Sequence, residues 1–271
     1  MAEGLGVVAI SYDSAEILQS FSERQGGIRY PMIADTESQI IKDFGLTNPN
    51  TKPGSMQYGM AFPGSYIVDS DGIVQNKFFN QSHRQRTTAK TVLMTLFAAG
   101  EGSGPRVEAD VEPQFKLTVM PTQDSVSGGQ TISLVADIEL YDKVHLYAPG
   151  SSYRAIDIKI ADNPALQQGD LSLPEPEMIY LEPIDETVPV YHGNVRISRE
   201  VAVSPLYRGE TIRIAATLEY QTCDDELCYL PDQMPLEFEL TMTPHDRIRT
   251  SEDIRHQDLP DEADGRTSTS N

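Results

Sequence analysis

The chain lacks the features that mark membrane-spanning and exported proteins. No stretch approaches the roughly 18 consecutive apolar residues that a transmembrane helix needs. The opening Met-Ala-Glu-Gly-Leu-Gly has neither the basic start nor the apolar run of a signal peptide. We therefore expect a soluble chain without membrane insertion. The sequence leaves the localisation unknown: cytoplasmic by default, and periplasmic if the start of the sequence is truncated.

Basic residues and cysteines are also scarce. The chain has 21 Lys and Arg against 41 Asp and Glu; 8 and 9 of these lie in residues 1–98, which leaves 13 and 32, or about −19, for the remainder. Such acidity repels phosphate backbones, so nucleic acid is not an expected partner. The two cysteines are too few for a disulfide-stapled secreted scaffold, and a single pair fits either redox compartment.

The 271 residues allow two domains, and residues 1–98 read as the first, an α/β domain. The apolar run 5–10 is typical of a buried parallel strand. A helix capped by Asp13 and Glu16 should follow, then a strand over 30–34 and a second helix opened by a Thr36–Gln39 capping box and ended by Gly45. Strands 65–69 and 73–79 should form a hairpin, and a helix over 86–98 should close the domain. The residues expected on buried helix faces are Ile17, Leu18, Phe21, Ile40, Ile41, Phe44, Val92, Leu93, Leu96 and Phe97.

The pattern changes after residue 98. Gly100-Glu-Gly-Ser-Gly-Pro105 has the composition of a flexible linker, which we place at 99–113. Residues 114–244 contain short alternating segments separated by turn residues, which predicts an all-β antiparallel sandwich. The segments are 115–120, 131–140, 155–160, 195–203, 211–220 and 236–242. The polar residues 245–271 read as a disordered tail.

Cys223 and Cys228 lie between two strand-like segments and can close a small disulfide at a hairpin end. Cross-linking so short a loop removes little unfolded-state entropy, which favours a reversible redox pair over a structural staple. Asp224, Asp225 and Glu226 disfavour a thiolate at Cys223, although they also fit a solvated turn. Cys228 should therefore be the more available sulfur.

The blocks Gly6–Glu16, Tyr30–Asp35, Phe44–Leu46 and Phe62–Gly72 resemble the AhpC/TSA (peroxiredoxin) family, which has a thioredoxin-like fold. The resemblance implies a peroxidatic cysteine on a helix upstream of the first strand here, and residues 1–98 contain no cysteine. Either the start is truncated or the domain is a docking scaffold. The resemblance also implies a cis Phe62–Pro63 bond lining the former substrate site, whereas base rates favour a trans bond.

Residues 112–244 resemble the N-terminal domain of the thiol:disulfide interchange protein DsbD, an immunoglobulin-like sandwich. The matching residues are Leu218–Cys223 with Cys228–Pro231, and Asp142–Pro149. The resemblance implies that the cysteine pair accepts electrons from a thioredoxin-like domain through the second cysteine. It places Tyr147 near the sulfurs or in the core, and a cap loop without phenylalanine at Pro183–His192. His145 and His192 could join the cysteines around zinc, but the spacing is weak evidence for a metal.

We therefore predict a thiol–disulfide oxidoreductase with Cys223 and Cys228 as its redox pair and Tyr147, Asp224, Asp225 and Pro63 as supporting residues. No cofactor or metal site is predicted. The expected partner is a thioredoxin-like protein or domain. A domain of the same chain would reach the cysteine pair across the linker. The expected substrate is a peroxide or a protein disulfide. The alternative is a non-catalytic interaction protein in which the disulfide is structural.

Overall fold

The computed structural model describes residues 5–48, 61–79, 86–96, 102–181 and 185–244. These residues fall into two compact units, one up to Phe62 and one from Pro63 onward. The expected tail over 245–271 lies outside the described residues.

The first unit contains two short strands and two helices in the predicted order. Strand β1 (Ala9–Ser11) pairs in parallel with β2 (Met32–Ala34), and α1 (Ala15–Arg24) connects them. Ser14, not Asp13, caps α1, because the Ser14 hydroxyl accepts a hydrogen bond from the Ile17 amide at 3.4 Å. The Asp13 carboxylate instead accepts a hydrogen bond from the Ser11 hydroxyl at 2.6 Å.

Helix α2 (Gln39–Asp43) also begins differently from the prediction. Its cap residue Ser38 makes no side-chain cap bond, and the Asp35 carboxylate accepts a hydrogen bond from the Ile41 amide at 2.9 Å. The predicted capping box is therefore wrong. The carboxylate of Asp35, which lies upstream of the predicted box, accepts from a backbone amide at the start of the helix instead. Gly45 follows the helix with a φ of +67°, a conformation that suits glycine, so the predicted end is confirmed.

The apolar side chains of the first unit are less buried than the sequence predicts. No residue of α1 is buried, and Phe21 is 39% exposed. In α2, Ile41 is buried but Phe44 is 52% exposed. The predicted burial of the first strand and helix is therefore wrong, because a two-stranded sheet offers little surface to cover them. The thioredoxin-like interpretation of this unit stays a prediction.

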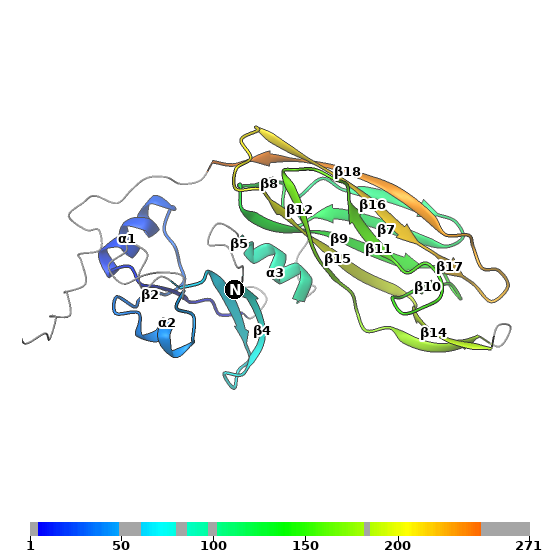
Figure 1. Ribbon diagram of the computed structural model, residues 1–271, viewed down its shortest axis with the longest axis horizontal. Helices are drawn as coiled ribbons and strands as arrows, with labels where there is room; N and C mark the ends of the chain where they lie inside the picture. Colours follow the sequence, from blue (N-terminus) through cyan, green and yellow to red (C-terminus); the bar gives the residue numbers. More distant parts are fainter. Residues whose placement is uncertain (1–4, 49–60, 80–85, 97–101, 182–184, 245–271) are drawn as a thin grey trace, which may run out of the picture. The chain divides into compact units, whose positions relative to one another are not determined.

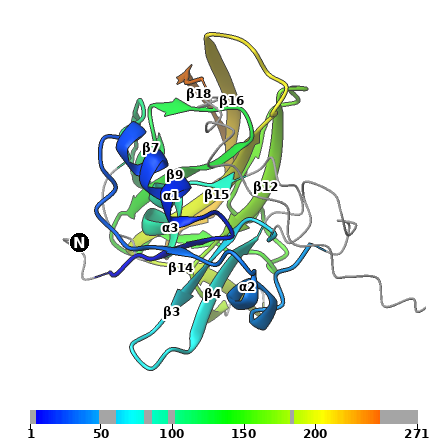
Figure 2. The same ribbon diagram turned by 90° about the vertical axis from the view of Figure 1, so that its left-hand side faces the viewer.

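The second unit starts with the predicted hairpin, drawn in cyan in Figure 2. Strands β3 (Gly64–Val68) and β4 (Val74–Phe79) pair antiparallel, which confirms the hairpin. The Asp69 carboxylate accepts hydrogen bonds from the amides of Asp71 and Ile73 at 3.0 and 2.9 Å. An aspartate that bonds to the backbone after it is typical of a tight turn.

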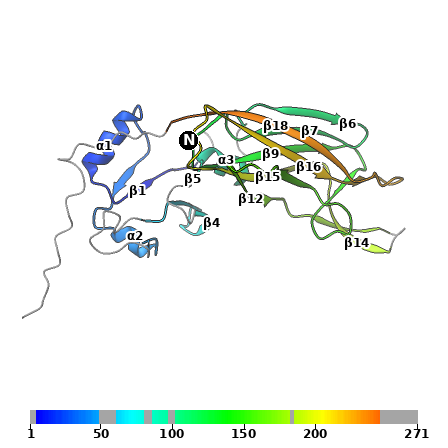
Figure 3. The same ribbon diagram turned by 45° about the horizontal axis from the view of Figure 1, so that its top comes forward.

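The next two elements pack on the sandwich rather than closing the first domain. Strand β5 (Arg86–Thr87) pairs in parallel with β9 (Gln130–Leu140), and α3 (Ala89–Leu96) contacts the same strand. Figures 1 and 3 show α3 beside β9. The Thr91 and Thr122 hydroxyls are 3.0 Å apart, and Val92 and Met94 are buried. The predicted domain limit at residue 98 thus differs from the grouping in the structure; Leu93 is half-buried, and the side chains of Leu96 and Phe97 lie outside the description.

The predicted flexible linker is wrong where the structure describes it. Strand β6 (Val107–Val111) pairs antiparallel with β7 (Phe115–Pro121) (Figure 3). Gly102 is buried, and a Cβ atom there would lie 2.6 Å from the Pro121 carbonyl oxygen. Glycine therefore permits close packing at this position, a use that composition does not distinguish from flexibility. Residues 99–101 of the predicted linker lie outside the described residues.

The remaining strands form three sheets. The first has the order β12-β15-β9-β7-β6, the second β11-β16-β18-β8, and the third β13-β14-β10-β17. Their bounds are β8 (Ser125–Val126), β10 (His145–Tyr147), β11 (Asp157–Ile160), β12 (Leu166–Ser172), β13 (Glu177–Leu181), β14 (Glu186–Tyr191), β15 (Asn194–Val203), β16 (Thr211–Tyr220), β17 (Thr222–Cys223) and β18 (Asp232–Met242).

Alternating side chains build the sandwich core. Along β16, every second residue from Ile212 to Tyr220 is buried, and these side chains pack with those of β7, β9, β15 and β18 in one cluster. The predicted all-β sandwich is confirmed. Strands β10, β14 and β17 gather at one end of it (Figure 1), and this end carries the cysteine pair.

Candidate redox site

Cys223 and Cys228 form a disulfide, as the sequence predicts. Cys223 ends β17, and the two cysteines face each other as an antiparallel bridge with their Cα atoms 4.0 Å apart. The Tyr229 amide donates to the Thr222 carbonyl oxygen at 3.0 Å, which extends the pairing by one step. The disulfide therefore closes a narrow hairpin end.

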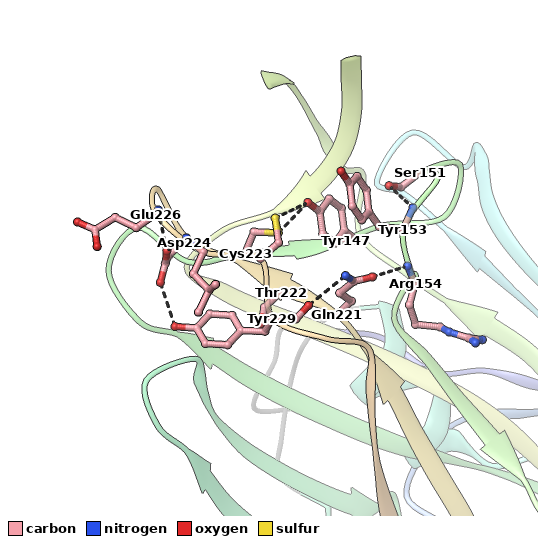
Figure 4. The surroundings of a disulfide bond; sticks show 12 residues. Tyr147, Ser151, Tyr153, Arg154, Gln221, Thr222, Cys223, Asp224, Glu226 and Tyr229 are labelled. Atoms are coloured by element: carbon pink, nitrogen blue, oxygen red, sulfur yellow. Dashed lines mark hydrogen bonds between the residues drawn. A yellow bond between two sulfur atoms is a disulfide. The ribbon is translucent and has the colours of Figure 1, made fainter. Parts of the chain in front are cut away.

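Asp224 organises the loop between the cysteines. One carboxylate oxygen accepts hydrogen bonds from the Glu226 and Leu227 amides at 2.8 and 2.7 Å, and the other accepts one from the Tyr229 hydroxyl at 2.9 Å (Figure 4). The two amide bonds, and then the Tyr229 bond, lower the pKa of Asp224. Its carboxylate is thus engaged in building the loop. Asp225 pairs with Lys143 at 3.4 Å with both side chains exposed, so this pair contributes little stability.

The two sulfurs differ sharply in accessibility. The Cys223 side chain is 1% exposed, whereas Cys228 is an exposed residue. Leu227 and Leu230 beside Cys228 are 56% and 85% exposed. A thiolate approaching from solvent therefore meets the exposed residue Cys228, whereas Cys223 is buried.

Strand β14 supplies the cover over Cys223. Val188 and Val190 are fully buried and form one apolar cluster with Cys223 and Tyr147, edged by Ile179 and Leu181. The cap expected at Pro183–His192 falls largely on this strand; Pro183 and Ile184 lie outside the described residues. Val188 and Val190 thus cover Cys223, whereas Cys228 is an exposed residue.

Tyr147 lies at the centre of this cluster and points its hydroxyl at the disulfide (Figure 4). The hydroxyl oxygen is 2.9 Å from the Cys223 sulfur and 3.8 Å from the Cys228 sulfur. Burial, with Tyr153 and Glu186 adding to it, raises the pKa of Tyr147 to about 12. The phenol therefore keeps its proton at neutral pH, and it is the donor because a disulfide sulfur has no proton to give.

Two residues that sequence reasoning missed hold Tyr147 and the loop in place. The Tyr153 ring stacks on the Tyr147 ring with centroids 4.3 Å apart. The Gln221 side chain donates to the Tyr229 carbonyl oxygen and accepts from the Arg154 amide, both at 3.0 Å. Composition and spacing do not assign these roles, because the Tyr153 ring and the Gln221 amide act through contacts that only the folded chain makes.

His145 and His192 lie beside the site. His145 is the cross-strand partner of Cys223, and its ring centroid is 5.9 Å from that of His192. His192 forms a pair with the Glu177 carboxylate at 3.3 Å. Within the described ranges, no group of three or more His, Cys, Asp or Glu residues is placed to hold a metal ion. With both sulfurs in the disulfide, the two histidines have no thiolate to share.

The structure does not bring Pro63 to this site. Pro63 precedes β3, and no hydrogen bond or ring contact of the described residues joins it to the cysteine pair. The expected cis Phe62–Pro63 bond is wrong, because the cis bond among the described residues is Glu112–Pro113.

No helix of the described residues is long and apolar enough to cross a membrane.

The fold and the exposed Cys228 define a β-sandwich that carries a disulfide at one end. Residues 112–239 match the family model described as thiol:disulfide interchange protein DsbD, N-terminal, and residues 1–77 match the AhpC/TSA family. Both resemblances expected from the sequence are thus confirmed. The chain combines segments similar to two families of thiol–disulfide redox proteins, whose members interact with thioredoxin-like proteins or domains.

Individual known proteins align with parts of the chain. Alkyl hydroperoxide reductase C of Buchnera aphidicola subsp. Acyrthosiphon pisum (strain APS) is 29% identical over 80 residues, which cover 27% of this chain and 37% of that protein. The reduced N-terminal domain of Neisseria meningitidis DsbD aligns with 20% identity and a TM-score of 0.32 over 40% of this chain and 78% of the other. The N-terminal periplasmic domain of Proteus mirabilis ScsB aligns with 13% identity and a TM-score of 0.36 over 52% of each chain.

Proposed function

We propose that the protein is a thiol–disulfide oxidoreductase whose Cys223–Cys228 disulfide accepts two electrons from a thioredoxin-like protein or domain. The donor thiolate attacks the Cys228 sulfur, the bond between the two sulfurs breaks, and Cys223 leaves as a thiolate. The second donor thiolate then attacks the mixed disulfide and releases Cys228. The donor ends as a disulfide, and two protons from solvent complete the two thiols of the acceptor.

The observation that carries the proposal is the asymmetry of the two sulfurs. The exposed Cys228 is the sulfur that a partner can reach, and the buried Cys223 receives the Tyr147 hydrogen bond. That hydrogen bond strengthens when Cys223 becomes a thiolate, because a charged acceptor binds a donor more tightly than a neutral one. Tyr147 therefore stabilises the leaving group of the proposed attack. A purely structural disulfide needs neither feature.

The proposed donor brings its own cysteines. Both cysteines of this chain form the acceptor pair, so the electrons come from a separate thioredoxin-like protein or from a domain beyond this sequence. The exposed Leu227 and Leu230 offer apolar contact to such a partner beside the reactive sulfur. The reduced cysteine pair then passes its electrons to a protein disulfide or to a partner that reduces a peroxide.

The test compares two single-cysteine variants. In Cys223→Ser and Cys228→Ser, the remaining thiol is activated as a mixed disulfide with a small aromatic thiol. Each variant is then incubated with a thioredoxin-like protein that lacks its resolving cysteine. Cys223→Ser should form the covalent complex readily and Cys228→Ser poorly, because Cys228 is an exposed residue and Cys223 is buried.

Melting curves of both variants provide the folding control. Equal yields of the complex, or the reverse order, in variants that are folded would overturn the assignment of Cys228 as the attacked sulfur. No complex with either variant would instead support the alternative of an interaction protein with a structural disulfide.

A further inference from the structure

His145 is a buried titratable group that the proposed exchange does not use. Its side chain is 6% exposed, and its Nε2 atom is buried without a hydrogen-bond partner among the described residues. Buried polar atoms in native proteins nearly always have a partner. A buried nitrogen without a partner among the described residues is available to a proton that another state of the site supplies.

The strand register identifies that partner. His145 on β10 lies directly opposite Cys223 on β17, and residues directly opposite in an antiparallel pair project from the same face. Tyr147, two residues along β10, shares this face: its ring meets the His145 ring edge-on at 5.3 Å, and its hydroxyl contacts the Cys223 sulfur. In the disulfide state this sulfur has no proton. Reduction gives it one.

The charged groups around His145 are few. His192 faces it from the end of β14, and Glu177 on β13 holds His192 at 3.3 Å. Asp224 and Asp225 act on it from the cysteine loop, with Asp225 paired to Lys143. Burial lowers the pKa of His145, and His192 acts in the same direction, while the two aspartates partly oppose both. His145 is therefore neutral at pH 7 in the disulfide state, with nitrogen available to take up a proton.

We propose that His145 holds the proton that the buried Cys223 sulfur acquires when the disulfide is reduced. This inference rests on the proposed function for its role, but the protonation itself requires only reduction. The donor dithiol supplies two electrons and becomes a disulfide. Of the two protons taken from solvent, one goes to Cys228 and one is shared between His145 Nε2 and the Cys223 sulfur, either as a thiol facing imidazole or as a thiolate facing imidazolium.

The arrangement has a consequence for pH dependence. A thiolate beside His145 favours the imidazolium, so the pKa of His145 must be higher in the reduced protein than in the disulfide protein. Between these two values the reduced pair keeps the shared proton, so reduction takes up two protons in all, one at Cys228 and one at the His145–Cys223 pair. Above the window the shared proton is lost, reduction takes up one proton, and its pH dependence becomes shallower.

The experiment follows the ring nitrogens of His145 by ¹⁵N NMR in the wild-type protein, titrated once as the disulfide and once after reduction with dithiothreitol. The pKa of His145 should rise on reduction. The same His145 titration curve in both states would overturn the proposal. This measurement needs no variant and so does not depend on the folding of one.

Variants give a second readout. The equilibrium with dithiothreitol is measured against pH for the wild type, His145→Gln and the matched control His192→Gln. His145→Gln should move the pH above which the profile becomes shallower to a lower value, because Cys223 then holds the proton alone, and His192→Gln should keep the wild-type value. An unchanged break in the profile of His145→Gln would contradict the proposal. A failure of the thioredoxin-like exchange together with a redox-linked His145 would refute the proposed function alone, so the two ideas are tested separately.

Discussion

Replacing Tyr147 by phenylalanine should slow reduction of the disulfide without unfolding the protein. The substitution keeps the ring that stacks on Tyr153 and removes only the hydroxyl that lies 2.9 Å from the Cys223 sulfur. A neutral disulfide sulfur is a weak acceptor. The loss of this bond should therefore lower the free energy of unfolding by no more than about 1 kcal/mol.

The effect on rate should be larger because Cys223 leaves as a thiolate. Hydrogen bonds to charged groups contribute about 1.5–3 kcal/mol, and about 1.4 kcal/mol corresponds to a factor of ten in rate. If most of this hydrogen-bond energy is present in the transition state, the disulfide of Tyr147→Phe should be reduced about 10- to 100-fold more slowly than that of the wild type. The pKa of Tyr147, raised to about 12, means that the hydroxyl donates throughout the neutral range.

The assay measures the second-order rate constant for reduction by a thioredoxin-like dithiol and, separately, by dithiothreitol. Tyr153→Phe is the matched control, because it also removes a phenol hydroxyl but leaves the Tyr147 hydroxyl at the sulfur. Tyr153→Phe should react within about twofold of wild type. A wild-type rate for Tyr147→Phe, or an equal slowing in both variants, would refute the leaving-group role.

Three further predictions concern the loop and the thiols. Removing the disulfide should cost only about 2 kcal/mol, since the chain-entropy model gives roughly 3 kcal/mol for a 15-residue loop and less for this shorter one; loss of cooperative unfolding on reduction, seen in thermal melts, would speak for a structural clip. The chain should not consume hydrogen peroxide with a thioredoxin-type reductant, and rapid turnover abolished by Cys223→Ser would contradict this. Asp224 has a lowered pKa in the folded loop, so its stabilisation is present above the unfolded value of about 3.9 and is lost as the pH falls through the folded pKa. The protection of the Glu226 and Leu227 amides against hydrogen exchange should fall in that acidic range. Unchanged protection would show that the carboxylate does not hold the loop.

Strict alternation made the sandwich predictable from the sequence. The segment 211–220 has the same bounds in the sequence reading and in the structure, because five of its side chains point into one continuous core. Strand β14 escaped prediction because it is short and contains Pro189, which normally argues against a paired strand. The cover over Cys223 comes from this strand, so the sequence alone left the shielding of the disulfide open.

Sequence reasoning reached Cys228 as the available sulfur, but the physical reason in the structure is different. The acidic residues were expected to act on Cys223 through their charge, whereas the Asp224 carboxylate bonds to its own loop. Burial of Cys223 is what separates the two sulfurs. Burial depends on strands far away in the chain, and local composition does not encode it. The same limit applies to the glycines near residue 102. A glycine-rich segment can be either flexible or closely packed, and its composition does not distinguish the two.

The most direct test of the account is the reduction potential of the Cys223–Cys228 pair, measured by equilibrium with glutathione buffers and mass spectrometry of alkylated thiols. Structural disulfides have potentials below roughly −300 mV and resist the glutathione pool, whereas exposed, exchanging disulfides have higher values. The exposed residue Cys228 and the hydrogen-bonded Cys223 leaving group predict a potential above that limit. A pair that stays oxidised in buffers poised at about −300 mV would contradict a redox role and identify the disulfide as structural.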